Sequence, residues 1–128
     1  MCTALIVEEN PAFRLSMKQM LHMRFPLILV DEAENGDEAV RKISASSPDM
    51  IFMNIKLSAG NGLDITRRIK DLNADAVIVM LTSHDLPEYR EAAYRSGASH
   101  FFAKDSSNCE EIVTLVESMM LAKGKSCS

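Results

Sequence analysis

A chain of 128 residues has the length of one compact domain, and its 47% apolar and 25% charged residues match globular averages, which excludes a disordered chain. The formal net charge of -4 disfavours sequence-independent nucleic-acid binding, which depends on a basic face. No apolar run approaches the roughly 20 residues of a membrane span, and the first residues carry no basic region typical of a secretory signal.

The three cysteines, Cys2, Cys109 and Cys127, are odd in number, far apart and without a CxxC pair. This usage favours free thiols in a reducing compartment over a disulfide framework. We therefore expect a cytoplasmic protein.

Five short apolar runs alternate along the chain with segments of helical periodicity. The runs cover residues 4–7, 27–30, 50–53, 76–81 and 100–103, and most are continuous, as strands covered on both faces should be. Apolar residues recur at helical spacing within 13–24, 39–43, 65–72, 86–94 and 112–120. This alternation predicts an α/β domain over residues 1–122 with a parallel sheet and right-handed crossovers.

Signals for helix starts support this division. Asn10 precedes Pro11, the order of an N-cap followed by proline at the first helical position. Asp85 and Ser107 each precede a glutamate at capping-box spacing. Residues 123–128 are polar and are expected to form a flexible tail.

Polar residues close the predicted strands. They are Glu8 and Glu9, Asp31 and Glu32, Asn54, Thr82, and Lys104. In open α/β sheets, ligands bind beyond the carboxyl ends of the strands, so these side chains are expected to meet at one edge. Acids, a hydroxyl and an ammonium group together would suit a metal ion and an oxyanion.

At this point the chain resembles the receiver domain of bacterial two-component response regulators, over about residues 3–122. The resemblance rests on the order and spacing of four segments: 5–11 (LIVEENP), 53–57 (MNIKL) through Gly62, 79–83 (VMLTS) and 97–105 (GASHFFAKD). It implies a doubly wound, flavodoxin-like sheet of five parallel strands in the order 2-1-3-4-5, flanked by five helices.

The resemblance also implies roles for single residues. Glu8 and Glu9 take the place of the acidic pair, and Glu9, Asn54 and the backbone carbonyl of Lys56 take the places of the Mg²⁺ ligands. Asn54 stands where the family has the aspartate that accepts a phosphoryl group from a histidine kinase. Thr82 and Lys104 correspond to the phosphoryl-binding residues, and Phe101 to the aromatic switch.

Departures from the family pattern alter these expectations. A carboxamide cannot form the acyl phosphate of an aspartate, so Asn54 is expected to abolish phosphorylation at this position. Glu9 is one methylene longer than the usual aspartate and Ser58 replaces a common proline. Since Mg²⁺ demands near-ideal octahedral geometry, we expect weak or absent Mg²⁺ binding and Lys104 paired with Glu8 or Glu9.

Several alternatives remain open from the sequence. Asn54 could be an engineered substitution in an ordinary phosphorylatable receiver, although Glu9 and Ser58 favour natural degeneration. A flavodoxin-like cofactor protein would need a phosphate-cradling loop after the first strand, where this chain has Glu8, Glu9 and Pro11. A phosphatase would need an aspartate nucleophile there.

The resemblance implies a signalling module without enzymatic activity. Its expected partners are a histidine kinase and a downstream effector protein or domain, with a homodimer as an open alternative and no direct contact with nucleic acid or membrane. The expected partner surface includes Tyr89, Tyr94, Arg95, Phe101 and the helix from Asn108.

Overall fold

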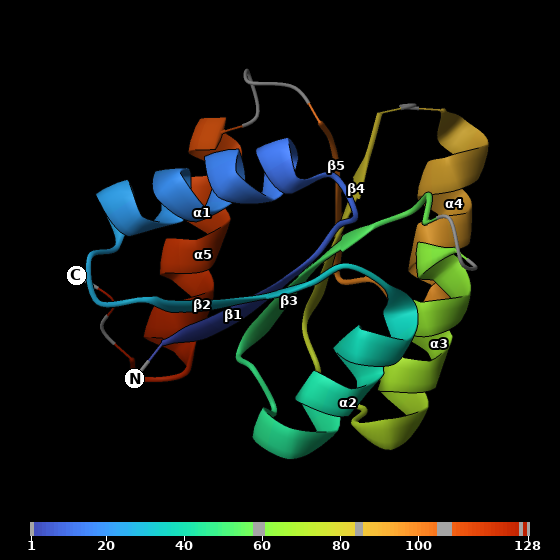
Figure 1. Ribbon diagram of the computed structural model, residues 1–128, viewed down its shortest axis with the longest axis horizontal. Helices are drawn as coiled ribbons and strands as arrows, with labels where there is room; N and C mark the ends of the chain where they lie inside the picture. Colours follow the sequence, from blue (N-terminus) through green and yellow to red (C-terminus); the bar gives the residue numbers. More distant parts are fainter. Residues whose placement is uncertain (1, 58–60, 84–85, 105–108, 126, 128) are drawn as a thin grey trace.

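The computed structural model describes residues 2–57, 61–83, 86–104, 109–125 and 127. Strands and helices alternate along the chain, as Figure 1 shows. Their bounds are β1 Thr3–Val7, α1 Pro11–Arg24, β2 Leu29–Ala33, α2 Gly36–Ser46, β3 Met50–Asn54, α3 Gly62–Leu72, β4 Ile78–Thr82, α4 Pro87–Ser96, β5 His100–Ala103 and α5 Cys109–Ala122.

The strands form one parallel sheet in the order β2-β1-β3-β4-β5, which confirms the predicted topology. The second strand differs from its prediction. It begins at Leu29 rather than at residue 27 and ends at Ala33, so Asp31 and Glu32 lie within it. β2 is an edge strand whose residues alternate between exposed and partly buried, and a search for continuous apolar runs therefore misplaced it.

Helices cover both faces of the sheet (Figure 1). One apolar cluster lies between the sheet and α2, α3 and α4, and a second lies between the sheet and α1 and α5. The two neighbouring phenylalanines of β5 separate as strand geometry requires: Phe101 belongs to the first cluster and Phe102 packs against the second. The sheet is therefore buried on both sides.

Two of the helix starts illustrate how local sequence sets the elements. The Asn10 side chain accepts hydrogen bonds from the backbone of Ala12 and Phe13, with Pro11 at the first helical position, as predicted. α4 begins at Pro87 with Leu86 at the N-cap position and no side-chain cap. The predicted caps Asp85 and Ser107 lie outside the described residues.

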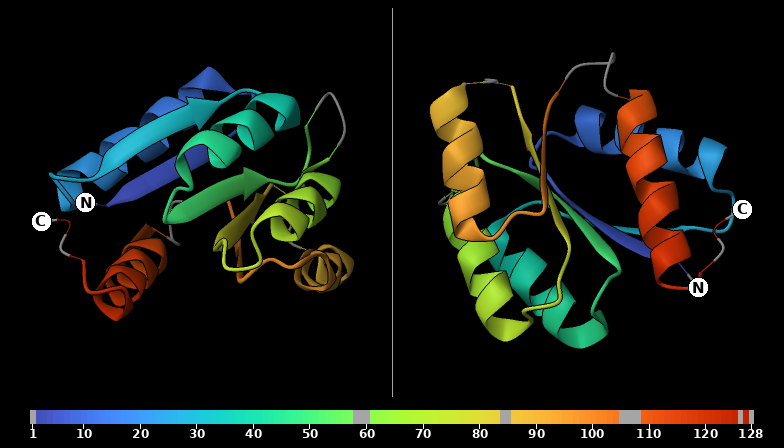
Figure 2. Two further views of the ribbon diagram at one scale, coloured as in Figure 1. Left: turned by 90° about the horizontal axis from the view of Figure 1, so that it is seen from below. Right: turned by 180° about the vertical axis from the view of Figure 1, so that it is seen from behind.

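The two ends of the chain lie together at the amino edge of the sheet (Figure 2). Cys2 and Cys127 form a disulfide with a Cα–Cα distance of 5.6 Å, while Cys109 is free. The expectation of free thiols is thus wrong for this pair. Their separation of 125 residues carries no local signal, and only the path of α5 back to the start of β1 brings them together.

The segment after α5 makes further contacts with the domain. Lys125 Nζ lies 2.7 Å and Lys123 Nζ 3.3 Å from the same carboxylate oxygen of Asp49. Asp49 is a buried carboxylate just before β3, and it attracts the two lysines. Among the described residues, no helix has both the length and the apolar character needed to cross a membrane.

Candidate functional site

The site lies where the carboxyl ends of β1, β3, β4 and β5 meet. Glu8 follows β1, Asn54 ends β3, Thr82 ends β4 and Lys104 follows β5. Glu8 and Thr82 are each 2% exposed and Asn54 is 8% exposed. The parallel register therefore gathers four polar side chains at one largely buried edge, as the sequence predicted.

The centre of this edge is an ion pair between Glu8 and Lys104. The Lys104 ammonium donates a short hydrogen bond to Glu8 Oε1, although the two residues are 96 positions apart. The ammonium also lies 4.4 Å from the centre of the Phe13 ring, a cation–π contact that replaces part of its lost hydration. Lys104 pairs with one of the two acids predicted for it.

The second carboxylate oxygen of Glu8 is buried, and it has no hydrogen-bond partner within the part of the chain that the structure describes. Burying such an oxygen unpaired is unfavourable, so this atom marks a place for a proton, a water molecule or a cation. Glu8 Oε2 is therefore a buried acceptor at this edge that has no donor among the described residues.

The first turn of α1 fixes the backbone that carries Glu8. The Arg14 guanidinium donates a 2.5 Å hydrogen bond to the Glu8 carbonyl, and its Nε lies 3.2 Å from Glu32. Glu32 also lies 3.6 Å from the Lys18 ammonium. Glu32 thus connects β2 to α1. The sequence predicted it among the side chains at the strand ends, but it lies outside that group because β2 continues past it to Ala33.

The carboxamide of Asn54 is turned toward the backbone of the following loop. Its Nδ2 donates a 2.6 Å hydrogen bond to the Lys56 carbonyl oxygen. That carbonyl is the one that the resemblance assigns to a metal ion. The Asn54 N–H group therefore donates to the carbonyl oxygen that a cation would otherwise contact. The sequence did not reveal this hydrogen bond, because it depends on the side-chain rotamer of Asn54.

Gly62, the first residue of α3, packs against the same strand end. Its amide donates a 2.6 Å hydrogen bond to the Ile55 carbonyl, and a Cβ at this position would lie 2.3 Å from the backbone oxygen of Asn54. Only glycine permits this approach, so Gly62 sets how closely α3 contacts the strand that carries Asn54.

On the far side of the site, β4 and β5 bring Thr82 beside Lys104. The Lys104 amide donates a 2.7 Å hydrogen bond to the Thr82 carbonyl. Phe101 is 4% exposed, with the Arg90 guanidinium 4.8 Å from its ring centre. An inward Phe101 agrees with the absence of a hydroxyl that would need a partner.

Glu9, the second acid of the predicted pair, is exposed. Among the residues that the structure describes, no group of three or more His, Cys, Asp and Glu side chains is arranged to hold a metal ion.

The predicted partner surface is present only in part. On α4, Tyr94 is 46% exposed and Arg95 is exposed, whereas Tyr89 is partly buried against the core. Phe101 is buried and does not share this surface, because its ring completes the cluster beneath α4. The predicted start of the last helix at Asn108 lies outside the described residues, and α5 begins at Cys109.

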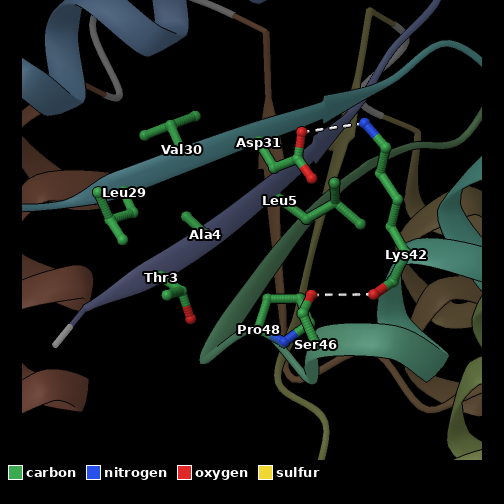
Figure 3. A pocket seen from close by; sticks show the side chains of 9 residues that line it. All are labelled: Thr3, Ala4, Leu5, Leu29, Val30, Asp31, Lys42, Ser46 and Pro48. Carbon is green, nitrogen blue, oxygen red and sulfur yellow. Dashed lines mark hydrogen bonds and ion pairs between the residues drawn. The ribbon is translucent and has the colours of Figure 1, made fainter.

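Two of the hollows among the described residues lie beside the strands. Figure 3 shows one of about 140 Å³ between β2 and α2, where the Lys42 ammonium binds Asp31 Oδ1 at 2.9 Å. Burial raises the pKa of Asp31. The hydrogen bonds from Lys42 and the Glu32 amide, together with the positive charges of Lys42 and Lys18, outweigh burial, so the pKa lies below its usual value. The other hollow, of about 370 Å³, separates α1 from α5 beside Lys104 and is mainly apolar. Besides Lys104, the free cysteine Cys109 also lines this second hollow.

The strand order and the five flanking helices define a doubly wound, flavodoxin-like α/β domain. Residues 4–117 match the response regulator receiver domain, and the chain belongs to that family. It is 33% identical over 100 residues to the chemotaxis protein CheY of Halobacterium salinarum, covering 78% of this chain and 82% of that protein.

Other relatives are longer than this chain. A putative transcriptional regulator of Pseudomonas aeruginosa is 29% identical over 120 residues, which cover 94% of this chain and 57% of that protein. For the transcriptional regulatory protein DegU of Brevibacillus brevis, the match covers 42% of the relative. The chain therefore spans about half the length of several curated relatives that it matches.

Solved structures agree with the fold. A two-component response regulator from Clostridium difficile has a TM-score of 0.86 at 26% identity, covering 94% of this chain and 97% of that one. The response regulator TrrA of Thermotoga maritima, solved in complex with Mg²⁺ and BeF, has a TM-score of 0.82 at 26% identity, covering 93% and 99%.

Proposed function

We propose that this receiver domain is a protein-interaction module whose phosphoacceptor position is occupied by Asn54, so that it does not accept a phosphoryl group there. The observation that carries the proposal is the Asn54 carboxamide at the end of β3, in the group that contains Glu8, Thr82 and Lys104 and hydrogen-bonded to the Lys56 carbonyl. This is the edge at which a receiver would carry out phosphoryl transfer.

The chemistry of the amide group supports this proposal. An aspartate attacks phosphorus with a carboxylate oxygen and forms an acyl phosphate, whereas a carboxamide carries no negative charge and offers a delocalised, weakly nucleophilic oxygen. In addition, the ammonium that would bind phosphoryl oxygens is already paired with Glu8. Both the nucleophile and the free cation of the reaction are therefore missing from this arrangement.

We also infer that Mg²⁺ binds weakly or not at all, although the family implies it. The residues fit the ion poorly: the Lys56 carbonyl accepts from Asn54, Glu9 is exposed, and Lys104 neutralises Glu8. The unpartnered Glu8 Oε2 is one suitable oxygen, but a single carboxylate oxygen does not provide the ligand set that Mg²⁺ requires.

The proposed output is a contact with another protein through α4 and the neighbouring part of the fold. Tyr94 and Arg95 present an aromatic ring and a cation to solvent, residue types that are enriched at interfaces. By family membership, a histidine kinase and an effector protein or domain are the proposed partners. Without phosphorylation to change its conformation, the domain would bind its partner in the same conformation that it has when unbound, with Phe101 buried.

Exposure to a small phosphoryl donor tests this function. The purified chain and its Asn54→Asp variant are incubated with acetyl phosphate and Mg²⁺, and phosphoryl uptake is measured by intact-protein mass spectrometry. The expected result is no phosphorylated species in the chain with Asn54 and a phosphoryl group on the variant that hydroxylamine removes, as expected for an acyl phosphate. Phosphorylation of the natural chain mapped to this site would contradict the proposal.

A further inference from the structure

The disulfide between Cys2 and Cys127 lies at the opposite edge of the sheet from the site described above. Cys2 precedes β1 and is 1% exposed, and Cys127 follows α5 and is 5% exposed. Both side chains belong to the apolar cluster beneath α1 and α5. The covalent bond therefore connects the segment after α5 to the start of β1.

The other attachments of this end are weaker. Cys127 accepts a 3.1 Å hydrogen bond at its carbonyl from the Leu27 amide. Lys123 and Lys125 reach Asp49, but their side chains are 36% and 33% exposed, so solvent screens these ion pairs and they hold the segment less firmly than a covalent bond. We call residues 123–127, which follow α5, the end segment. Without the disulfide, these contacts would have to offset the conformational entropy that the end segment loses when it is held against the domain.

The end segment also covers apolar surface. A hollow of about 130 Å³ is lined by Phe25, Met120, Leu121, Lys125 and Cys127. Phe25 is 5% exposed and Met120 is 2% exposed while the segment is in place. Because Lys125 and Cys127 line the same hollow as these two side chains, we expect departure of the segment to increase the exposure of Phe25 and Met120.

We propose that Cys2 and Cys127 form a reversible redox modification site, at which thiol–disulfide exchange with a low-molecular-weight thiol releases the C-terminal segment and uncovers the apolar surface around Phe25 and Met120. The oxidised protein holds the segment against β1 and β2. The reduced protein keeps its sheet and frees the segment. This device does not depend on whether Asn54 takes a phosphoryl group.

The exchange balances in two steps. Cys127 is 5% exposed, so the first step takes place during a transient local opening of the segment after α5. A thiolate of the external thiol then attacks the Cys127 sulfur, forms a mixed disulfide and expels the Cys2 thiolate, which takes up a proton. A second external thiolate attacks the external sulfur of that mixed disulfide and releases the Cys127 thiolate, which is then protonated. Two external thiols are oxidised to one disulfide while the protein disulfide is reduced to two thiols.

Two backbone amides make the test specific. The Leu27 amide donates to Cys127, whereas the Leu29 amide donates to the Cys2 carbonyl at 2.8 Å in the β2–β1 ladder. Hydrogen exchange of both amides is measured by NMR on the whole chain, equilibrated with mixtures of reduced and oxidised glutathione. The disulfide content of each sample is measured by mass spectrometry after alkylation.

We expect exchange at Leu27 to accelerate at least about tenfold as the disulfide is reduced, while Leu29 changes less than about twofold. Cys127→Ser should match the reduced protein in every mixture. Cys109→Ser, which removes the free half-buried thiol, should follow the natural chain.

Either of two results would overturn the proposal: no Cys2–Cys127 disulfide in any glutathione mixture, or unchanged exchange at Leu27 after complete reduction. Equal acceleration at Leu27 and Leu29 would also contradict it, because it would show unfolding of the sheet rather than release of the end segment. Reduction of the natural chain supplies the result even if Cys127→Ser does not fold.

Discussion

At the scale of single residues, the pair of Glu8 and Lys104 dominates the site. Its two side chains are 3% and 13% exposed, so both charges have lost most of their hydration. The contact with Phe13 and the hydrogen bond between the pair compensate this loss. Such a pair gives modest net stability, but removal of one partner leaves a buried charge uncompensated.

Replacing Lys104 with methionine should therefore destabilise the protein by about 2–4 kcal/mol at pH 7, because the Glu8 carboxylate loses its counterion in a buried position. The double variant Glu8→Gln/Lys104→Met should recover most of this loss. Urea unfolding of the natural chain and both variants measures the difference. A double variant less stable than Lys104→Met would show that the pair does not act as a buried couple.

The residue scale also shows what sequence reasoning can reach. The pairing of Lys104 with an acid was predictable, since parallel strands end at one edge and opposite charges there must meet. The hydrogen bond from Asn54 to the Lys56 carbonyl was not, because it depends on one rotamer and one loop. The prediction that Cys2 and Cys127 are free thiols was wrong, because spacing along the chain does not show which distant segments the fold brings together.

At the scale of elements, the approach of α3 to β3 positions the strand end that carries Asn54. Continuous apolar runs correctly identified the buried strands β1 and β3, whereas the edge strand β2 was displaced because its outer positions are polar. The asparagine caps of α1, α2 and α3 each bond to the first turn of the helix, although only Asn10 was singled out from sequence. The hydrophobic pattern of the sequence thus predicted whether each segment is a strand or a helix, whereas the bounds of the edge strand β2 depend on how it packs in the fold.

Gly62→Ala should cost about 2–3 kcal/mol, since its Cβ would lie 2.3 Å from the backbone oxygen of Asn54 and neither backbone can easily move. Gly36→Ala is a matched control, because the atoms nearest to its Cβ belong to the Ile65 side chain rather than to a backbone, and a side chain can shift more easily. Thermal and urea unfolding should therefore rank Gly62→Ala well below Gly36→Ala. Equal losses would mean that the α3–β3 approach adjusts freely.

At the scale of the whole molecule, the disulfide and the Asp49 cluster connect the two chain ends across the amino edge of the sheet. The disulfide closes a loop with a sequence separation of 125 residues, so it constrains nearly the entire unfolded chain. Asp49 accepts hydrogen bonds from the Thr3 backbone and from Lys123 and Lys125. The polar site at the carboxyl edge of the sheet shares no residue with the disulfide and the Asp49 cluster at the amino edge.

Reduction of the disulfide should lower the free energy of unfolding by about 3–5 kcal/mol, because an unfolded chain without the long covalent loop gains conformational entropy. Urea unfolding with and without a reductant measures the loss, with Cys109→Ser as a control that responds to reduction as the natural chain does. A reduced protein of unchanged stability would contradict the contribution assigned to this bond.

Acid should weaken the contact at Asp49. Burial raises the pKa of this carboxyl, but hydrogen bonds from Lys125, the Thr3 amide and Lys123 outweigh burial and lower it from 3.8 to about 2. A carboxyl with a lowered folded-state pKa contributes stability above its unfolded-state pKa, and this contribution is lost as the pH falls toward 2. The natural chain should exceed Asp49→Asn by about 1–2 kcal/mol at pH 7, with the difference vanishing near pH 2. A difference in unfolding free energy that does not depend on pH would contradict this assignment.

The proposed loss of phosphoryl chemistry depends on the Asn54 amide taking the place of a cation beside Lys56, and Mg²⁺ titration by isothermal calorimetry tests this most directly. The natural chain should show no saturable binding up to about 10 mM Mg²⁺, while Asn54→Asp, which restores a carboxylate and removes the N–H donor, should bind at least about tenfold more tightly. Micromolar Mg²⁺ affinity in the natural chain, or equal affinity in both proteins, would contradict the account.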